Sequence, residues 1–298
     1  MSSALLTFVL MQYVVSVKAG LVNHVQGTAN VAEMEQVRRG QTIQTANSGY
    51  VEVLLTPGSF IRIGENSAVV LDGVELESVS LRVLQGPAVI EVIDINKKFP
   101  IKVTTGELST NIIAAGIYRF EDGVATVIDG KLKTADSGLT YEDGWQVFIK
   151  DSYRARKVKK VQTTSLDLYS QARSQTIADV NATLAASLSP SYGSSDPYWL
   201  FSPDLGCYTF MPHAHYRSPY GYHYYPTGTR RVLSPTYSTS NDSRGTTSPS
   251  SNTGNTSNTG NTDSGGAPAP VTVSTPSGER AAPAVYIESK SSPVGATQ

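Results

Sequence analysis

The chain has 298 residues, a formal net charge of −1 at pH 7 and a single cysteine. This near-neutral charge excludes a general electrostatic attraction to nucleic acid or to anionic membranes. One cysteine excludes an intramolecular disulfide framework, so a folded core must depend on apolar burial and backbone hydrogen bonds. A chain of this length has room for one or two domains.

Residues 1–19 have the pattern of a signal peptide. An apolar run over residues 4–17, interrupted by Gln12, is shorter than the ~20 residues that a membrane-spanning helix needs. Small side chains near Ala19 suit cleavage before Gly20, although no Lys or Arg precedes the apolar run. We therefore expect export to the periplasm, the cell envelope or the medium, with no stable membrane span after processing. The alternative is a buried N-terminal strand or helix.

Residues 49–130 have the rhythm of an all-β module, in which short strand-like runs each end at a glycine. Val51, Val53 and Leu55 alternate with polar Glu52. A period of two with β-branched residues predicts strands with one buried face and one polar face. Sustained helical periodicity is absent from this part of the sequence, which argues against an α/β nucleotide-binding domain.

The same alternation surrounds two arginines. Arg62 lies between two isoleucines, and Arg119 lies between Tyr118 and Phe120. Residues 56–59 (Thr-Pro-Gly-Ser) predict a tight turn between two strands, because proline presets φ and glycine accepts a positive φ.

Seven fragments of this region occur in a characteristic order and spacing. They are residues 37–45, 48–49, 57–59, 84–86, 101–104, 115–120 and 127–131. Together they resemble the FecR domain, the extracytoplasmic domain of bacterial FecR-type regulators. The resemblance extends over roughly residues 20–150 and implies an all-β fold, a compact β-solenoid or sandwich.

FecR-type regulators carry a cytoplasmic segment that restrains a sigma factor, and then a transmembrane helix, before this domain. Here the β module begins about twenty residues after Met1. We therefore expect the domain to occur without the sigma-regulating segment, so that the regulatory role is not carried over with it.

Residues 151–189 combine a basic stretch with a helix. Six of the residues 150–160 are Lys or Arg, against one acid, Asp151. This basic stretch could hold an acidic polymer, or it could be an edge strand whose charges discourage strand addition by another chain. The second interpretation is the more ordinary one.

Residues 165–188 are predicted to form an amphipathic helix with Ser165 as its N-cap. We expect its apolar stripe to dock on the sheet of the same protein. The stripe consists of Leu166, Tyr169, Ala172, Thr176, Val180 and Leu184.

Residues 190–232 are rich in Tyr, Pro and Gly. Aromatic rings separated by turns are suitable platforms for sugar rings or proline-rich peptides. The alternative is that the segment wraps the β module and adds to its core. The candidate ligand-binding surface consists of Trp199, Tyr208, Tyr216, Tyr220 and Tyr222.

Metal and thiol chemistry have weak support in the same segment. His213 and His215 point to one side of an extended chain and could share a metal ion, but no second cluster completes a site. Cys207 is a poor candidate nucleophile, because a thiolate needs an organised base. We expect no metal and no other cofactor.

Catalytic signatures are also missing from the sequence, which has no nucleophile elbow, zinc-protease motif, phosphate-binding loop or dinucleotide fingerprint. A pair of carboxylates could act as in glycosidases. Acidic residues are, however, also expected on the solvent-exposed faces of strands that alternate apolar and polar residues. We expect a protein without enzymatic activity. The acids that could pair are Glu65, Glu75, Glu77, Glu91 and Asp94.

Residues 233–298 form a low-complexity tail that we expect to be disordered. The whole pattern favours an exported FecR-domain protein that acts as a binding or scaffold module at the cell envelope, with a protein or a glycan as partner and no nucleic acid. The alternatives are a carbohydrate- or peptidoglycan-binding module and an accessory component of a sigma-regulator system. The sequence leaves the oligomeric state open.

Overall fold

The computed structural model describes residues 18–150, 152–189 and 195–229. The expected signal peptide, residues 1–19, lies almost entirely outside the described residues, and the expected disordered tail lies entirely outside them. All described residues belong to the first of two compact units, Met1–Thr236.

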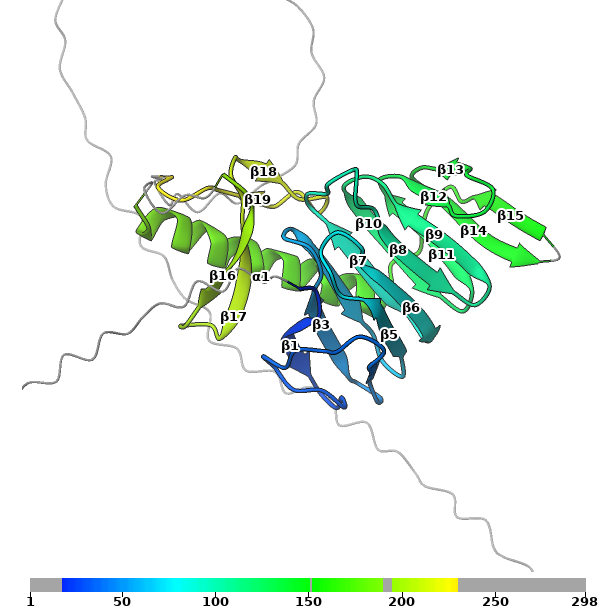
Figure 1. Ribbon diagram of the computed structural model, residues 1–298, viewed down its shortest axis with the longest axis horizontal. Helices are drawn as coiled ribbons and strands as arrows, with labels where there is room; N and C mark the ends of the chain where they lie inside the picture. Colours follow the sequence, from blue (N-terminus) through cyan, green and yellow to red (C-terminus); the bar gives the residue numbers. More distant parts are fainter. Residues whose placement is uncertain (1–17, 151, 190–194, 230–298) are drawn as a thin grey trace, which may run out of the picture. The chain divides into compact units, whose positions relative to one another are not determined.

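Two large β-sheets dominate the described chain, which confirms the predicted all-β class with one helix (Figure 1). The eight-stranded sheet has the order β1 (Leu21–Gln26), β3 (Tyr50–Leu54), β4 (Ser59–Ile63), β7 (Ala88–Val92), β10 (Gly116–Glu121), β11 (Val124–Asp129), β14 (Trp145–Lys150) and β15 (Ser152–Lys157). The seven-stranded sheet has the order β13 (Thr140–Tyr141), β12 (Leu132–Thr134), β9 (Leu108–Ile112), β8 (Ile101–Thr105), β6 (Ser80–Gln85), β5 (Ala68–Gly73) and β2 (Thr42–Gln44). Most of the basic stretch thus forms β15 at the end of the larger sheet, as the edge-strand interpretation expected.

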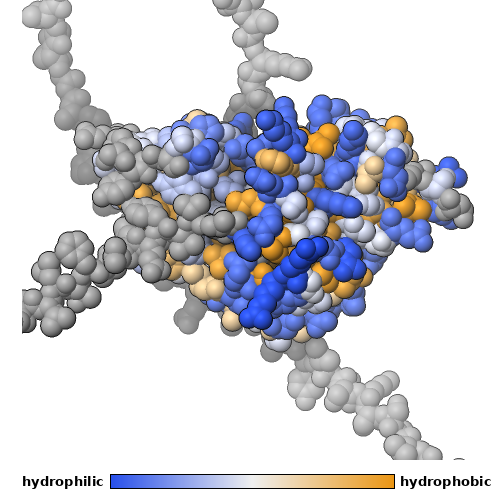
Figure 2. All heavy atoms as spheres, in the orientation of Figure 1, coloured by the Kyte–Doolittle hydropathy of each residue, from blue (hydrophilic) through white to orange (hydrophobic). Residues whose placement is uncertain are grey.

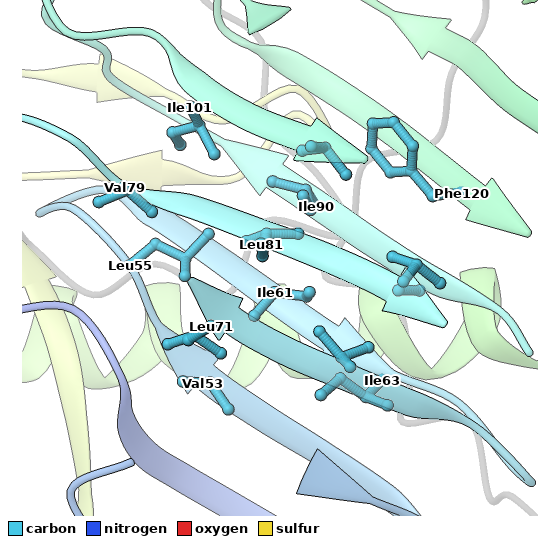
Figure 3. Close-up of a cluster of buried hydrophobic side chains, with 14 of the residues drawn as sticks. Val53, Leu55, Ile61, Ile63, Leu71, Val79, Leu81, Ile90, Ile101 and Phe120 are labelled. Carbon is cyan, nitrogen blue, oxygen red and sulfur yellow. The ribbon is translucent and has the colours of Figure 1, made fainter. Parts of the chain in front are cut away.

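One core lies between the two sheets, as in a β-sandwich. The alternating apolar residues of β3 and β4, such as Val53 and Ile61, share a buried cluster with Leu71 and Leu81 from the other sheet (Figure 3). These four side chains are 0–1% exposed. The period of two in the sequence thus places one face of each sheet in a common core.

The predicted turn at residues 56–59 is confirmed. The amide of Ser59 donates to the carbonyl of Thr56 at 2.7 Å, and Gly58 has a φ of +86°, which favours glycine. A Cβ at Gly58 would lie 3.2 Å from ring atoms of Phe210. The turn therefore also permits the close approach of the aromatic segment.

The expectation of one buried face and one solvated face is wrong for the centre of the eight-stranded sheet. Every residue of β3, β4 and β7 is buried, because the helix α1 (Ser165–Ser187) and the aromatic segment contact the face that points away from the sandwich core. In the seven-stranded sheet the expectation holds, since β6 and β8 alternate buried with exposed or half-buried positions.

The helix ends one residue before the predicted limit, and its N-cap is Thr164, one residue before the predicted Ser165. Thr164 and Asp167 form a capping box, in which the Thr164 amide donates to Asp167 Oδ2 at 2.7 Å. The predicted apolar stripe is partly wrong, because Ala172 and Thr176 are exposed. The buried face is mixed, and it contains Leu166, Asp167, Ser170, Ser174, Ile177, Ala178, Val180, Asn181 and Ala185.

Two hairpins follow the helix. The first pairs β16 (Tyr198–Ser202) with β17 (Cys207–Met211), and the second pairs β18 (Tyr216–Arg217) with β19 (His223–Tyr224). Both hairpins contact α1, and β17 also contacts β1. The aromatic segment therefore packs around the sandwich, as one of the two interpretations of the sequence expected.

Exposed apolar side chains do not gather on one element. On the face seen in Figure 2, hydrophobic residues are interspersed with hydrophilic ones. The large hydrophobic side chains that are most exposed come from separate parts of the described chain, so they do not define one apolar docking face. They are Met34, Leu84, Leu139, Leu168 and Leu205.

Candidate binding site

A layer of buried charges fixes α1 on the eight-stranded sheet. Arg62 of β4 lies at its centre, with Nε 2.8 Å from Glu52 Oε2 and Nη1 2.7 Å from Glu91 Oε2. Arg173 of the helix adds a third ion pair, with Nη2 2.9 Å from Glu52 Oε1. The side chains of Glu52, Arg62 and Glu91 are 0% exposed. Glu91 is therefore no solvated surface acid, contrary to the expectation from the sequence.

Small polar residues of the helix complete this layer. The hydroxyl of Ser170 accepts from Arg62 Nη1 at 2.9 Å, and the hydroxyl of Ser174 donates to Glu91 Oε1 at 2.7 Å. The phenol of Tyr220 donates to Ser170 Oγ at 2.9 Å. One network thus joins the sheet, the helix and the aromatic segment, which explains why serines occupy the buried face of α1.

The pKa values of the two carboxyl groups of this layer, Glu52 and Glu91, are shifted in opposite directions. Burial alone would raise the pKa of Glu52, but Arg62 and Arg173 together lower it to about 2. Burial raises the pKa of Glu91 and outweighs the stabilising effects of Arg62 and Ser174. Because these groups are fully buried and contact one another, their role is to position α1 rather than to contact a ligand.

Trp199 and Tyr208, two of the predicted ligand-binding residues, lie in the core instead of on the surface. Trp199 is 0% exposed, and its ring centroid lies 5.0 Å from that of Phe60 at an angle of 65°. Tyr208 is 5% exposed. The reason is that the outer face of β4 presents an apolar ring at Phe60, and burial against the hairpin β16–β17 removes that ring from water.

Two asparagines hold the hairpins in place. Asn181 of α1 donates to the carbonyls of Phe210 and Tyr225, at 2.9 Å and 3.0 Å, and accepts from the Tyr225 amide at 2.7 Å. Asn23 of β1 accepts from the Tyr208 amide at 2.6 Å and donates to Glu52 Oε1 at 2.9 Å. These bonds satisfy backbone groups that would otherwise be buried without partners, so they fix the position of both hairpins.

The fixed hairpins leave a cleft of about 710 Å³ beside the sandwich. One wall consists of loops of the sandwich, at residues 56–57, 76–77, 94–96 and Phe99. The other wall consists of residues 196–197, His213 and Tyr216 from the aromatic segment. A cleft of this size falls within the range of ligand sites in proteins, and it exists only where the two parts of the chain meet.

The lining of this cleft is acidic and aromatic. Glu77, Asp94 and Asp196 contribute carboxylates, whereas no Lys or Arg is among the lining residues that the structure describes. Phe99 and Tyr216 contribute rings. Burial raises the pKa of Tyr216, and the charge of Asp94 and a hydrogen bond with that carboxylate raise it further. The cleft therefore suits a ligand with cationic or hydroxyl groups and one flat apolar face.

Of the five predicted ligand-binding residues, Tyr216 alone lines this cleft. Tyr220 is half-buried and bonded to Ser170, and Tyr222 is half-buried against the cluster that contains Trp199. Two of the acids that the sequence singled out for their chemistry, Glu77 and Asp94, do line the cleft. Phe99 and Asp196 were missed, because nothing local distinguishes them from ordinary loop residues.

His215 lies against His223 rather than sharing a site with His213. Nε2 of His215 lies 2.9 Å from Nδ1 of His223, with the rings stacked at 5.0 Å, whereas His213 packs edge-on against Tyr216. In the described ranges no three potential metal ligands come together. Cys207 is buried, and burial raises the pKa of its thiol, which makes it a poor nucleophile.

Residues 41–133 match the family model described as FecR protein. No curated protein matches the chain. Among solved structures, the chain resembles one described as a "putative anti-sigma factor" from Parabacteroides distasonis, with 14% sequence identity and a TM-score of 0.33. This match covers 39% of the chain and 59% of the solved chain. Within the described ranges, no helix is both long and apolar enough to cross a membrane.

The residues matched by the family model run from the turn before β2 to β12, so they include strands of both sheets. This region also contains Arg62 and Glu91 of the buried charge layer and the sandwich wall of the cleft. By this match, residues 41–133 form a FecR domain within the chain.

Proposed function

We propose that the protein is exported and acts as a non-enzymatic binding or scaffold module in a signalling-related assembly of the cell envelope. The FecR domain supports the signalling context. The cleft between the sandwich and the aromatic segment is the observation that carries the binding role. Its ligand is a segment of an envelope protein that places a Lys or Arg between the carboxylates of Glu77, Asp94 and Asp196.

The acidic lining supports a cationic protein segment. Carboxylates in a partly enclosed cleft attract an ammonium or guanidinium group more strongly than carboxylates on an open surface do, because less water screens them. The ring of Tyr216 offers a face for the aliphatic part of the same side chain or for a cation–π contact. The Tyr216 ring is held by its packing against Phe210 and His213.

Export is tested by fractionating cells that make the full chain and sequencing the N-terminus of the recovered protein. A chain that begins at or near Gly20 in the periplasm, envelope or medium is the expected result. Recovery of Met1 in the cytosol would overturn the export proposal and leave the cleft without an envelope partner.

The binding role is tested by crosslinking in the living cell. A photoreactive phenylalanine derivative at Leu76, which lines the cleft, should capture a protein that the same group at exposed Leu139 does not capture. Capture should fall at least severalfold in an Asp94→Asn, Tyr216→Ala double variant. Equal capture at both positions, or capture that is unchanged in the double variant, would contradict a specific binding site in the cleft.

A glycan is the second candidate ligand, because Phe99 and Tyr216 offer rings beside carboxylates that can accept hydrogen bonds from sugar hydroxyls. The full chain would then be retained on insoluble peptidoglycan, and Tyr216→Ala would release it. Retention of the native chain that Tyr216→Ala does not change would place any glycan contact outside the cleft.

A further inference from the structure

Strand β15 differs from the other ends of the two sheets because no described part of the chain covers its outer edge. Strand β1 is covered on its outer side by residues 34–36, since the Val22 amide donates to the Glu35 carbonyl and the Met34 amide donates to the Val22 carbonyl, both at 2.9 Å. The outer side of β2 is covered by Asn30, which bonds to the backbone of Thr42 and Gln44.

The remaining two edges are unequal in length. Strand β13 has two residues, whereas β15 has six, and among the described residues β14 is the one strand that pairs with β15. Figure 1 shows β15 as the last strand of its sheet, beyond β14. An open edge of this length can accept a strand from another chain.

The register of β14 and β15 shows which backbone groups of β15 point outward. The Val158 amide donates to the Gly144 carbonyl at 2.8 Å, and the paired residues continue from there as Trp145↔Lys157 to Lys150↔Ser152. Hydrogen-bonded and non-hydrogen-bonded pairs alternate in an antiparallel ladder. The backbone groups of Arg154 and Arg156 therefore point toward β14, and those of residues 153, 155 and 157 point away from it.

The side chains of β15 differ between its two faces. Arg154 and Arg156 are exposed and lie on the same face of the strand, two residues apart. Ala155 points to the opposite face, where it is half-buried against the sandwich core. A strand added beside β15 would thus have the arginines next to one of its faces and the end of the core next to the other.

We propose that β15 binds an extended segment of an acidic partner protein by strand addition. Acidic and apolar residues alternate in this partner segment. Backbone amides and carbonyls of residues 153, 155 and 157 bond to the added strand. Acidic side chains of that strand pair with Arg154 and Arg156, and its apolar side chains lie beside Ala155. This surface is separate from the acidic cleft, and it does not depend on the function proposed for that cleft.

The charges of this edge decide between two kinds of occupant. A second copy of the chain added edge to edge would bring the arginines of one β15 against those of the other, and like charges on neighbouring strands destabilise the pairing. An acidic strand at the same place would form favourable charge pairs with Arg154 and Arg156. The basic residues of β15 therefore oppose self-association and favour an acidic partner. Specific interfaces commonly combine attraction to one partner with repulsion of another in this way.

The test is NMR-detected hydrogen exchange on the full chain with two synthetic peptides of about eight residues, the length of a long strand. In one peptide Glu alternates with Val, and in the other Lys alternates with Val. The Glu peptide should slow exchange of the amides of residues 153, 155 and 157, and it should bind about tenfold more tightly than the Lys peptide, because two charge pairs reverse sign. Added salt should reduce the difference.

Charge reversal supplies the decisive control. In an Arg154→Glu, Arg156→Glu variant the Lys peptide should protect these amides and the Glu peptide should not. Ala155→Pro removes an outward amide without removing a bond to β14 and should weaken binding of both peptides. Equal protection by both peptides, protection in another part of the chain, or an unchanged preference after charge reversal would each overturn the proposal.

Discussion

Arg62 in β4 and Arg82 in β6 occur in the same local pattern, each between two apolar residues of a strand. Arg62 is 0% exposed and paired with two buried carboxylates. The side chain of Arg82 is 50% exposed and forms a forked pair with Asp72 on the surface of the other sheet. The same alternation therefore produces a buried charge layer in one sheet and an ordinary surface ion pair in the other.

The cause of this difference is the chain that follows the FecR domain. Helix α1 and the hairpin β16–β17 cover the centre of the eight-stranded sheet. The face of the seven-stranded sheet that carries Arg82 has no such cover in the described ranges, since Arg82 and Lys102 are exposed. The comparison teaches that a polar position in a strand becomes structural only when a later segment covers it.

Replacing the two arginines gives the largest expected contrast. Arg62→Met should lower the free energy of unfolding by about 3–5 kcal/mol, because it leaves Glu91 buried without an ion pair and leaves Glu52 paired with Arg173 alone. Arg82→Met should cost about 1 kcal/mol or less. Urea denaturation followed by tryptophan fluorescence measures both values. Equal losses of unfolding free energy in the two variants would contradict the structural role of the buried charge layer.

Trp199→Ala tests the covering hairpin. Removal of this fully buried ring should cost about 3–5 kcal/mol, since a cavity is left against Phe60 and Phe210. Phe148→Ala, on the half-exposed strand β14, should cost about 1 kcal/mol. Far-ultraviolet circular dichroism during urea denaturation avoids the loss of the fluorescent reporter. A small cost for Trp199→Ala would show that the hairpin does not contribute to the stability of the sheet.

Acidification should weaken the buried layer in a defined window. The pKa of Glu52 is lowered from about 4.5 to about 2 in the folded chain, so its contribution is complete above pH 4.5 and is lost as the pH falls toward 2. The full shift corresponds to about 3 kcal/mol. Urea midpoints at pH 5, 4, 3 and 2 measure this loss of stability, and an unchanged midpoint over this range would contradict it.

Glu91 acts on the same curve at higher pH and with the opposite sign. Its pKa is raised above about 4.5 in the folded chain, so its protonation stabilises the folded state as the pH falls toward 4.5, and it adds no further change below that pH. Glu91→Gln should therefore lose the gain in stability on acidification toward pH 4.5 and keep the loss below it, whereas Glu52→Gln should keep the gain and lose less stability between pH 4.5 and 2. The reverse assignment of the two windows would contradict the two shifts.

Thr164→Ala gives the smallest expected effect. It removes the side chain that accepts from the Asp167 amide at the start of α1 and should cost about 1 kcal/mol. Thr163→Ala, one residue earlier and exposed, is the matched control and should be neutral. Urea midpoints of the two variants are compared at constant pH, and identical midpoints would place the helix boundary elsewhere.

The sequence was a good guide to the sandwich and the helix and a poor guide to the candidate site. The alternation around Val53 and Ile61 predicts the core face of the sheet, and the spacing from Leu166 onward predicts the helix. It does not predict that Trp199 is buried, because an aromatic ring has the same local sequence context in a core and on a binding surface. The cleft joins Asp94 to Asp196 and Tyr216, and no local pattern relates residues so distant in the chain.

The sequence by itself determined the elements of this protein: the all-β class, the turn at Gly58 and the helix that begins at Ser165. These features follow from the period of two, the allowed φ of glycine and helical spacing, which are local properties of the chain. Only the tertiary structure decided that Glu52, Arg62 and Glu91 are buried while Arg82 remains on the surface. Burial of a charge depends on which segment covers it and on the partners that this segment brings, and both are properties of the assembled fold.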